Sequence, residues 1–407
     1  MNVLHERCAG LDLADDGLIA GIRIQTGKQI HEEHRGFATH TRGLLELVDW
    51  LSGHGITHVV MEATGSYWRA VWQILESHFE LMLANARDVK TVPGRKSDVN
   101  DALWLAGLHA HGLLRPSFVP PVSIQDLRDL TRTRTQLIRE IVQHTQRIQK
   151  VLDTANIKLT AVASDIKGVS CRAMIRAIIR GETDPEVLAG MALGRLKSKH
   201  DLLIEALRGR VRPHHRAMLE LHLDIIESLE RSVVRLEERI EAALLPFRRQ
   251  RELLVTMPGI SMTSAAVLIA ELGVDMSQFG TARRLISWAC LCPGLDITGG
   301  RPKSTRTRKG AKWLKAQLVQ CAQSAIKKKD SYYKSLFHRI CARRGANKAK
   351  VAVAAAMLTA IFHMLENDVP YHDLGSDHFV RNDRERAAKR LVHQLNRLGY
   401  TVQIEAA

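Results

Sequence analysis

The first 120 residues alternate between short apolar runs and polar turns, a pattern that predicts mixed α/β structure. Residues 8–14 alternate as a strand does, and the turn at 15–17 leads into a second apolar run. Farther on, apolar residues recur every three to four positions, as on one face of a helix. The predicted strands are 8–14, 18–25, 29–37, 56–61 and 80–85, and the predicted helices are 42–51, 67–77 and 98–111. The first three strands should form an antiparallel meander.

The predicted order of these elements is βββαβαβα, which is the succession used by the ribonuclease-H-like fold. A segment with three prolines, 115–121, interrupts the pattern and ends this part of the chain.

Two long helical stretches with heptad periodicity follow. The first begins near Ser123, and the second lies before residue 250. This spacing is a coiled-coil signature, and it leaves open whether the helices pair as a hairpin within one chain or as a seam between two chains. Residues 160–215 between them read as a small helical insertion. The first set is Leu127, Leu130, Arg134, Leu137, Ile141, His144, Ile148 and Val151, and the second is Ile226, Leu229, Val233, Leu236, Ile240, Ala243 and Phe247.

From residue 251 onward the chain is predicted to be mostly helical. The turn at 258–260 joins two apolar helical segments and resembles a helix-hairpin-helix, whose turn can present backbone N–H groups to a phosphate. Ser261 stands where a second glycine is usual, so a plain helical corner is an alternative. A helix over 281–291, a loop over 294–310 and two or three helices up to about Asn367 complete the pattern.

Composition narrows the class of protein. With 407 residues, 45% hydrophobic and 25% charged, the chain resembles neither a disordered protein nor a disulfide-stapled miniprotein. The longest apolar stretch, 351–362, is shorter than the roughly 20 residues that cross a bilayer. The N-terminus does not resemble a signal peptide, and the six cysteines form no CxxC pair. We therefore expect a cytoplasmic protein with no membrane partner.

The positive charge is concentrated in one segment. The net charge is +16, and residues 301–350 contain sixteen Lys or Arg and one acid, Asp330. Clustered cations suit a polyanion because phosphate neutralisation releases counterions. A solubilising or membrane-surface face is the alternative, but no amphipathic apolar face accompanies the cluster. The pattern favours nucleic acid.

Four carboxylates occupy positions that the predicted fold could bring together. Asp12 lies inside a strand, Glu62 follows a buried strand, and Asp98 and Asp101 share one face at the start of a helix. Singly, each fits an ordinary surface or helix-start acid. Together, on these elements, they predict a cleft that holds Mg²⁺, which can polarise a phosphodiester.

Several segments carry a resemblance to a known family. GLDLA, VMEATGSYW, NARDVKTVPGRKSDVNDA, LLRPSF, MPGISMTSAAVLIAELG and RTRKGAKWLKAQL look very like the DEDD transposases of the IS110 insertion-sequence family, the bridge-RNA-guided recombinases. The resemblance covers nearly the whole chain. It implies three parts: a RuvC-like DEDD catalytic domain at 1–118, a coiled-coil and helical insertion at 119–250, and a mostly helical C-terminal transposase domain at 251–407. The expected fold class is therefore α/β plus α.

The resemblance also implies partners and a mechanism. A homodimer or homotetramer would act on donor and target DNA in the bacterial cytoplasm at the nucleoid, and a structured guide (bridge) RNA would choose the sites. Asp12, Glu62, Asp98 and Asp101 match the family's acidic tetrad, which holds Mg²⁺. The family's second catalytic residue is a serine that forms a covalent link to DNA, and here Thr298 occupies its place. Threonine has the same hydroxyl, but its methyl group restricts χ1.

The residues expected to contact nucleic acid are mostly basic. Ser304 could be a shifted nucleophile, although its basic neighbours favour phosphate contact. The expected contacts are Arg95, Lys96, Arg301, Lys303, Ser304, Arg306, Arg308, Lys309 and Lys312.

Two other functions remain open, a Mg²⁺-dependent hydrolytic RuvC-like nuclease and a non-catalytic nucleic-acid-binding homologue.

Overall fold

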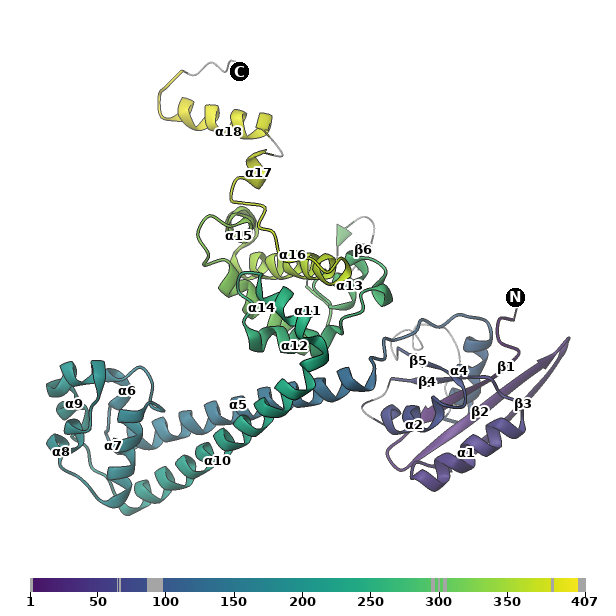
Figure 1. The fold of residues 1–407 in the computed structure, drawn as a ribbon, viewed down its shortest axis with the longest axis horizontal. Helices are drawn as coiled ribbons and strands as arrows, with labels where there is room; N and C mark the ends of the chain where they lie inside the picture. Colours follow the sequence, from purple (N-terminus) through teal and green to yellow (C-terminus); the bar gives the residue numbers. More distant parts are fainter. Residues whose placement is uncertain are drawn as a thin grey trace. The chain divides into compact units, whose positions relative to one another are not determined.

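The computed structural model describes residues 3–63, 65, 67–85, 98–293, 297–298, 301–302, 306–381 and 384–401. The chain forms two compact units, Met1–Pro120 and Pro121–Ala407. Figure 1 shows their elements. The further division that the sequence predicts near residue 250 stays a prediction.

The first unit is built on a mixed five-stranded sheet with the strand order β3-β2-β1-β4-β5. The central strand β1 pairs antiparallel with β2 and parallel with β4. The predicted meander and the mixed α/β class are therefore confirmed. The strands are β1 (Arg7–Leu13), β2 (Gly17–Thr26), β3 (Gln29–Ala38), β4 (His58–Glu62) and β5 (Glu80–Ala84), and the helices are α1 (Thr41–Gly53), α2 (Trp68–Leu75) and α4 (Asp98–Ala110).

Helices cover both faces of this sheet. On one face Leu47 of α1 and Leu75 of α2 pack with Leu11 and Met61 of the strands in one hydrophobic core. On the other face Leu105 of α4 packs against the central strands. Side chains alternate between faces along a strand, so neighbouring strand residues contribute to different cores.

Two paired glycines let α4 approach the sheet closely. Gly10 of β1 lies opposite Gly21 of β2. A Cβ at Gly10 would lie 2.3 Å from the carbonyl oxygen of Ala102, and one at Gly21 would lie 2.8 Å from the backbone nitrogen of Leu103. No real contact is that short, so only glycine allows this packing.

Gly10→Ala is expected to lower the free energy of unfolding by about 1–3 kcal/mol, because the new methyl group meets backbone that cannot rotate away. Urea denaturation followed by circular dichroism measures the change. Gly107→Ala is the matched control. Gly107 lies on α4, the helix that packs against Gly10, and a Cβ at Gly107 would have open space around it. That variant should gain roughly 0.5–1 kcal/mol from helix propensity. Equal stability of the two variants would contradict the close packing of α4.

The second unit begins with two long helices that pack along each other, α5 (Val122–Thr154) and α10 (Pro213–Ala243). They pair within one chain. The two polar heptad positions of α5 meet polar partners on α10: Arg134 donates to Glu237 at 2.6 and 2.9 Å, and Nδ1 of His144 lies 3.2 Å from Nδ1 of His222. These contacts explain why the predicted apolar pattern is interrupted there. The last predicted heptad position, Phe247, was wrong. Helix α10 ends at Ala243, and Pro246 follows, so Phe247 lies outside this helix.

The segment between α5 and α10 forms the predicted helical insertion. Its apolar residues join the far parts of both long helices in a separate core that includes Ile148, Met174 and Leu223. A bidentate pair fastens it, because Arg172 donates to both carboxylate oxygens of Glu230 at 2.7 and 2.8 Å. The elements are α6 (Leu159–Val162), α7 (Val169–Arg180), α8 (Pro185–Gly190), η1 (Gly194–Lys199) and α9 (His200–Leu207).

The helices within residues 248–366 surround the largest of these cores, which also takes in the start of α5 and the end of α10. The turn between α11 and α12 packs tightly at Gly259, where φ is +86° and a Cβ would lie 2.4 Å from the carbonyl oxygen of Cys321. Ser261 caps α12 by accepting a hydrogen bond from the N–H of Ser264 at 3.2 Å. The elements are η2 (Leu245–Phe247), α11 (Arg248–Val255), α12 (Met262–Leu272), η3 (Ser277–Phe279), α13 (Ala282–Trp288), β6 (Ile297–Thr298), β7 (Arg301–Pro302), α14 (Lys312–Ala325), α15 (Tyr332–Arg344), α16 (Ala346–Glu366), α17 (His378–Arg381) and α18 (Arg384–Arg397).

Helix α16 is longer than the apolar stretch that the sequence indicates. By length and composition alone this one helix of the described chain could cross a membrane, with a mean hydropathy of 1.5 over 18 residues. Its residues Val353, Met357 and Ile361 are fully buried in the core of the second unit. Helices α17 and α18 were not predicted.

Candidate functional site

Asp12 and Glu62 lie at neighbouring positions at the carboxyl ends of β1 and β4. The two strands are parallel, and their pairing brings Leu11 opposite Met61. Asp12 and Glu62 are the next residues on each strand, and both are partly buried. Two carboxylates therefore share one end of two adjacent strands.

Both residues face the side of the sheet that α4 covers. Gly10 contacts α4, and alternation along the strand puts Asp12, two residues on, on the same side. Val60 of β4 shares a core with Leu105 of α4, which puts Glu62 on that side as well.

The direction of α4 decides which of its ends lies near these strand ends. The thiol of Cys8 donates to the carbonyl oxygen of Ala106 at 3.4 Å, whereas Gly10 lies against Ala102. Moving along β1 toward Asp12 therefore means moving back along α4 toward its first turn.

Asp98 and Asp101 lie in that first turn. Asp98 is the first residue of α4, and Asp101, three residues on, is partly buried. The side chain of Asp98 lies outside the described residues. The structure thus brings the strand ends that carry Asp12 and Glu62 and the first turn of α4 to one end of one face of the sheet.

This donor set has the chemistry that Mg²⁺ prefers, because its ligands are carboxylate oxygens. Among the described side chains, which do not include that of Asp98, no group of three or more His, Cys, Asp or Glu is arranged to hold a metal ion. Metal binding by these four residues therefore stays a prediction.

At the other end of α4, the thiol of Cys8 on β1 and the imidazole of His109 on α4 are both buried. Burial raises the pKa of Cys8 to about 11, so its thiol stays protonated at neutral pH. Burial, together with the nearby imidazoles of His5 and His58, lowers the pKa of His109 to about 4.

Thr298 belongs to the two-residue strand β6, which pairs with β7 so that Thr298 lies opposite Arg301. The structure describes the backbone of these two residues and not their side chains. The role of Thr298 as a nucleophile stays a prediction.

The basic residues predicted to bind nucleic acid fall into three groups. Arg306, Lys309 and Lys312 are exposed. Arg308 is partly buried, and its guanidinium donates to the backbone carbonyl and the hydroxyl of Ser287 at 2.5 and 2.7 Å. The side chain of Arg301 is not described, and Arg95, Lys96, Lys303 and Ser304 lie outside the described residues.

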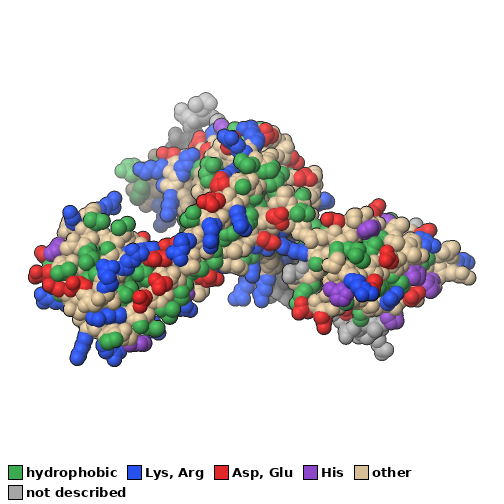
Figure 2. Space-filling view, turned by 60° about the horizontal axis from the view of Figure 1, so that its bottom comes forward, with side chains coloured by type: hydrophobic (Ala, Val, Ile, Leu, Met, Phe, Trp, Pro, Cys, Tyr) green, Lys and Arg blue, Asp and Glu red, His purple; other side chains and the backbone are tan. Residues whose placement is uncertain are grey.

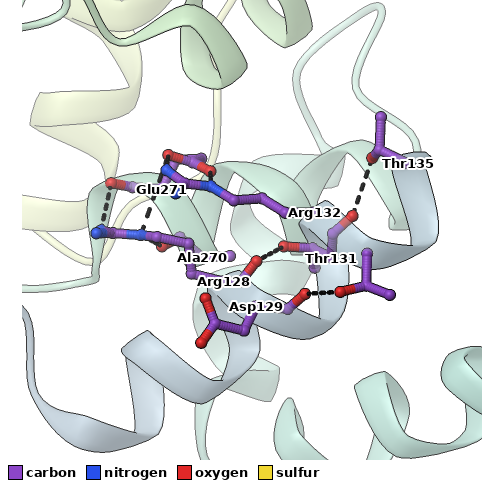
Figure 3. A network of polar contacts seen from close by, with 8 residues as sticks. Arg128, Asp129, Thr131, Arg132, Thr135, Ala270 and Glu271 are labelled. Carbon is purple, nitrogen blue, oxygen red and sulfur yellow. Dashed lines mark hydrogen bonds and ion pairs between the residues drawn. The ribbon is translucent and has the colours of Figure 1, made fainter. Parts of the chain in front are cut away.

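A polar network that the sequence did not reveal joins α5 to the end of α12 (Figure 3). Arg132 donates to both carboxylate oxygens of Glu271 at 2.7 and 2.8 Å, and Arg128 donates to the backbone carbonyls of Ala270 and Glu271 at 2.9 and 3.0 Å. Glu271 is 5% exposed. The signal in the sequence was a glutamate within an apolar helical segment, because a carboxylate that is buried there needs a cation.

Lys and Arg side chains lie in groups on the face drawn in Figure 2, with Asp and Glu interspersed. A group that the sequence analysis missed surrounds Trp313, where Arg132 and Arg139 of α5 meet Lys312 of α14. The spacing of seven residues between the two arginines is a signal, since it places them on one helix face.

Comparisons with known proteins agree at both ends of the chain. A transposase family model for the DEDD transposases of IS110 matches residues 9–157. The model of the transposase IS116/IS110/IS902 family matches residues 251–338.

A curated relative, the mini-circle transposase assigned to IS117 in Streptomyces coelicolor, is 26% identical over 244 aligned residues. This alignment covers 54% of the chain, and the chain spans 58% of that relative. The two family models together match more than half of the sequence, and they name the same group. The protein therefore belongs to the IS110 family of transposases.

Proposed function

We propose that the protein is a transposase that cuts and joins DNA strands as a site-specific recombinase. The observation that carries this proposal is the placement of Asp12, Glu62 and the first turn of α4 at one end of one sheet face. The strand order and the covering helices support a RuvC-like fold for the first unit. The paired helices α5 and α10 support a coiled coil for the middle of the chain.

In this proposal Asp12, Glu62, Asp98 and Asp101 hold Mg²⁺. The ion, when bound, supplies charge that polarises the phosphodiester and stabilises the leaving oxygen. The strand ends and the first turn of α4 fix the positions of the carboxylates. Close packing at Gly10 keeps that turn against the sheet.

Thr298 supplies the nucleophile in this proposal. Its hydroxyl gives up its proton as the oxygen forms a bond to phosphorus, the bond from phosphorus to one deoxyribose oxygen breaks, and that oxygen takes up a proton. The covalent link conserves the phosphodiester energy, so a second DNA hydroxyl can reverse the reaction at a new site. A structured guide RNA selects the sites, and a homodimer or homotetramer holds donor and target DNA together.

The substitution of threonine for the serine expected from the resemblance favours a second candidate. A hydrolytic RuvC-like nuclease needs the same carboxylates and Mg²⁺ but uses water, and it forms no link between protein and DNA. The crowding caused by the methyl group of Thr298 would disfavour covalent attack.

Covalent adducts with labelled DNA, separated by denaturing electrophoresis, distinguish the two. We expect Thr298→Ser to keep or raise adduct formation and recombination, and Thr298→Val to abolish both, because valine keeps the shape and lacks the hydroxyl. Ser304→Ala is the control, and it should weaken binding only. Recombination by Thr298→Val would exclude Thr298 as the nucleophile, and strand cleavage by wild-type protein without any adduct would favour the nuclease.

A further inference from the structure

An open groove of about 930 Å³ lies in the second unit beside α14. We call it the Trp313 groove. Its lining has five cationic residues and no acidic one. It is lined by Arg132, residues 307–313, Lys315, Ala316 and Val319.

The indole of Trp313 is the aromatic surface of this groove. Three cations lie over it: the guanidinium of Arg139 at 4.9 Å, that of Arg132 at 5.7 Å and the ammonium of Lys312 at 5.7 Å, each measured to a ring centroid. The arginines come from α5 and the lysine from α14. Two elements far apart in sequence therefore place charge around one ring.

Contacts with the rest of the protein hold several of these groups in place. Arg132 is fixed by the bidentate bond to buried Glu271, and Arg308 is fixed by Ser287 (Figure 3 shows the first of these). The ammonium of Lys315 donates to the hydroxyl of Thr307. Side chains held in this way lose little conformational freedom when a ligand binds. Lys309 and Lys312, by contrast, are exposed.

We infer that the Trp313 groove binds an unpaired nucleotide of a nucleic-acid strand, with its base against Trp313 and the neighbouring phosphates on Lys309 and Lys312. Aromatic rings stack on any base, and surrounding cations neutralise the backbone, which is how proteins commonly hold single strands. A paired base is already stacked within its duplex, so the aromatic contact selects unpaired strands. This inference rests on the proposed function, since it names where that activity holds a strand.

Binding of fluorescent oligo(dT), oligo(rU) and a DNA duplex of equal length to the full chain, measured by anisotropy, tests the inference. Trp313→Leu should lower the affinity for at least one single strand about tenfold or more, because base stacking on one aromatic ring has roughly that effect. Affinity for the duplex should stay near that of wild type. Trp313→Phe should restore most of the loss, and the two oligonucleotides show whether the strand is DNA or RNA.

Two controls separate stacking from charge and from folding. Trp72→Leu makes the same change on α2 in the first unit and should leave binding unchanged. Lys312→Gln should make the salt dependence shallower by a slope of about 0.7, whereas Trp313→Leu should leave the slope unchanged. Wild-type affinity of Trp313→Leu for both strands, or an equal loss for strands and duplex, would overturn the inference.

Adduct formation and DNA cleavage in the same preparations report on the proposed function separately. Normal cleavage with no effect of Trp313→Leu on strand binding overturns the groove alone. Stacking-dependent binding without cleavage by the wild type overturns the enzymatic function alone.

Discussion

Replacing Asp12 by Asn should abolish DNA cleavage while leaving nucleic-acid binding close to that of the wild type. The amide keeps the size of the side chain and removes the charge that would hold Mg²⁺. A metal contributes several kcal/mol to such a reaction, so the rate should fall by about a thousandfold or more. Asp101→Asn should behave in the same way. Cleavage of labelled DNA with Mg²⁺ as the sole divalent cation measures the loss.

Asp16→Asn provides the matched control. Asp16 is exposed in the turn just after β1, so the same change of charge occurs a few residues from Asp12 on a side chain that is open to solvent. Its activity should equal that of wild type. Full activity of Asp12→Asn or Asp101→Asn would exclude the residue in question from the metal site.

Glu271→Ala should lower the free energy of unfolding of the second unit by about 3–5 kcal/mol. The change removes both bonds from Arg132 and leaves Arg128 and Arg132 facing each other without the carboxylate between them. It also removes a buried side chain where α12 meets α5. Urea denaturation followed by circular dichroism measures the effect.

A surface pair on α11 gives the comparison. Arg248 and Glu252 also form an ion pair, at 3.0 Å, but their side chains are 81% and 51% exposed. Glu252→Ala should therefore change stability by less than about 1 kcal/mol. If the two glutamate variants lost the same stability, the network around Glu271 would not be what joins α5 to α12.

Local patterns predicted the first unit well because its elements are short and polar turns separate its apolar runs. The strand with Asp12 and the helix that starts at Asp98 are where the alternation of residues placed them. Asp12 stands out in the sequence as a candidate site residue because it interrupts an apolar strand, where a carboxylate is costly without a partner. Sequence reasoning also found the two long helices.

Contacts between distant residues could not be predicted in the same way. Arg132 and Glu271 are 139 positions apart, and nothing in the periodicity of either helix indicates that the two meet. In the sequence Trp313 is a single aromatic residue with Lys312 and Lys315 nearby. The arginines that surround it come from α5, so they depend on how α5 packs in the second unit. Pairing of Arg134 with Glu237 likewise needed the antiparallel arrangement of α5 and α10, which heptad spacing leaves undefined.

The two cores on the α5–α10 hairpin limit how the length of the hairpin can change by insertion. One hydrophobic core surrounds its base, where Leu127 and Ile240 lie, and a second surrounds its tip, where Ile148 and Leu223 lie. Inserting one heptad into each helix between these cores would move the tip outward by about 10 Å with little rotation. An insertion of four residues would turn the tip relative to the base. The hairpin can therefore act as a spacer whose length varies in steps of seven residues.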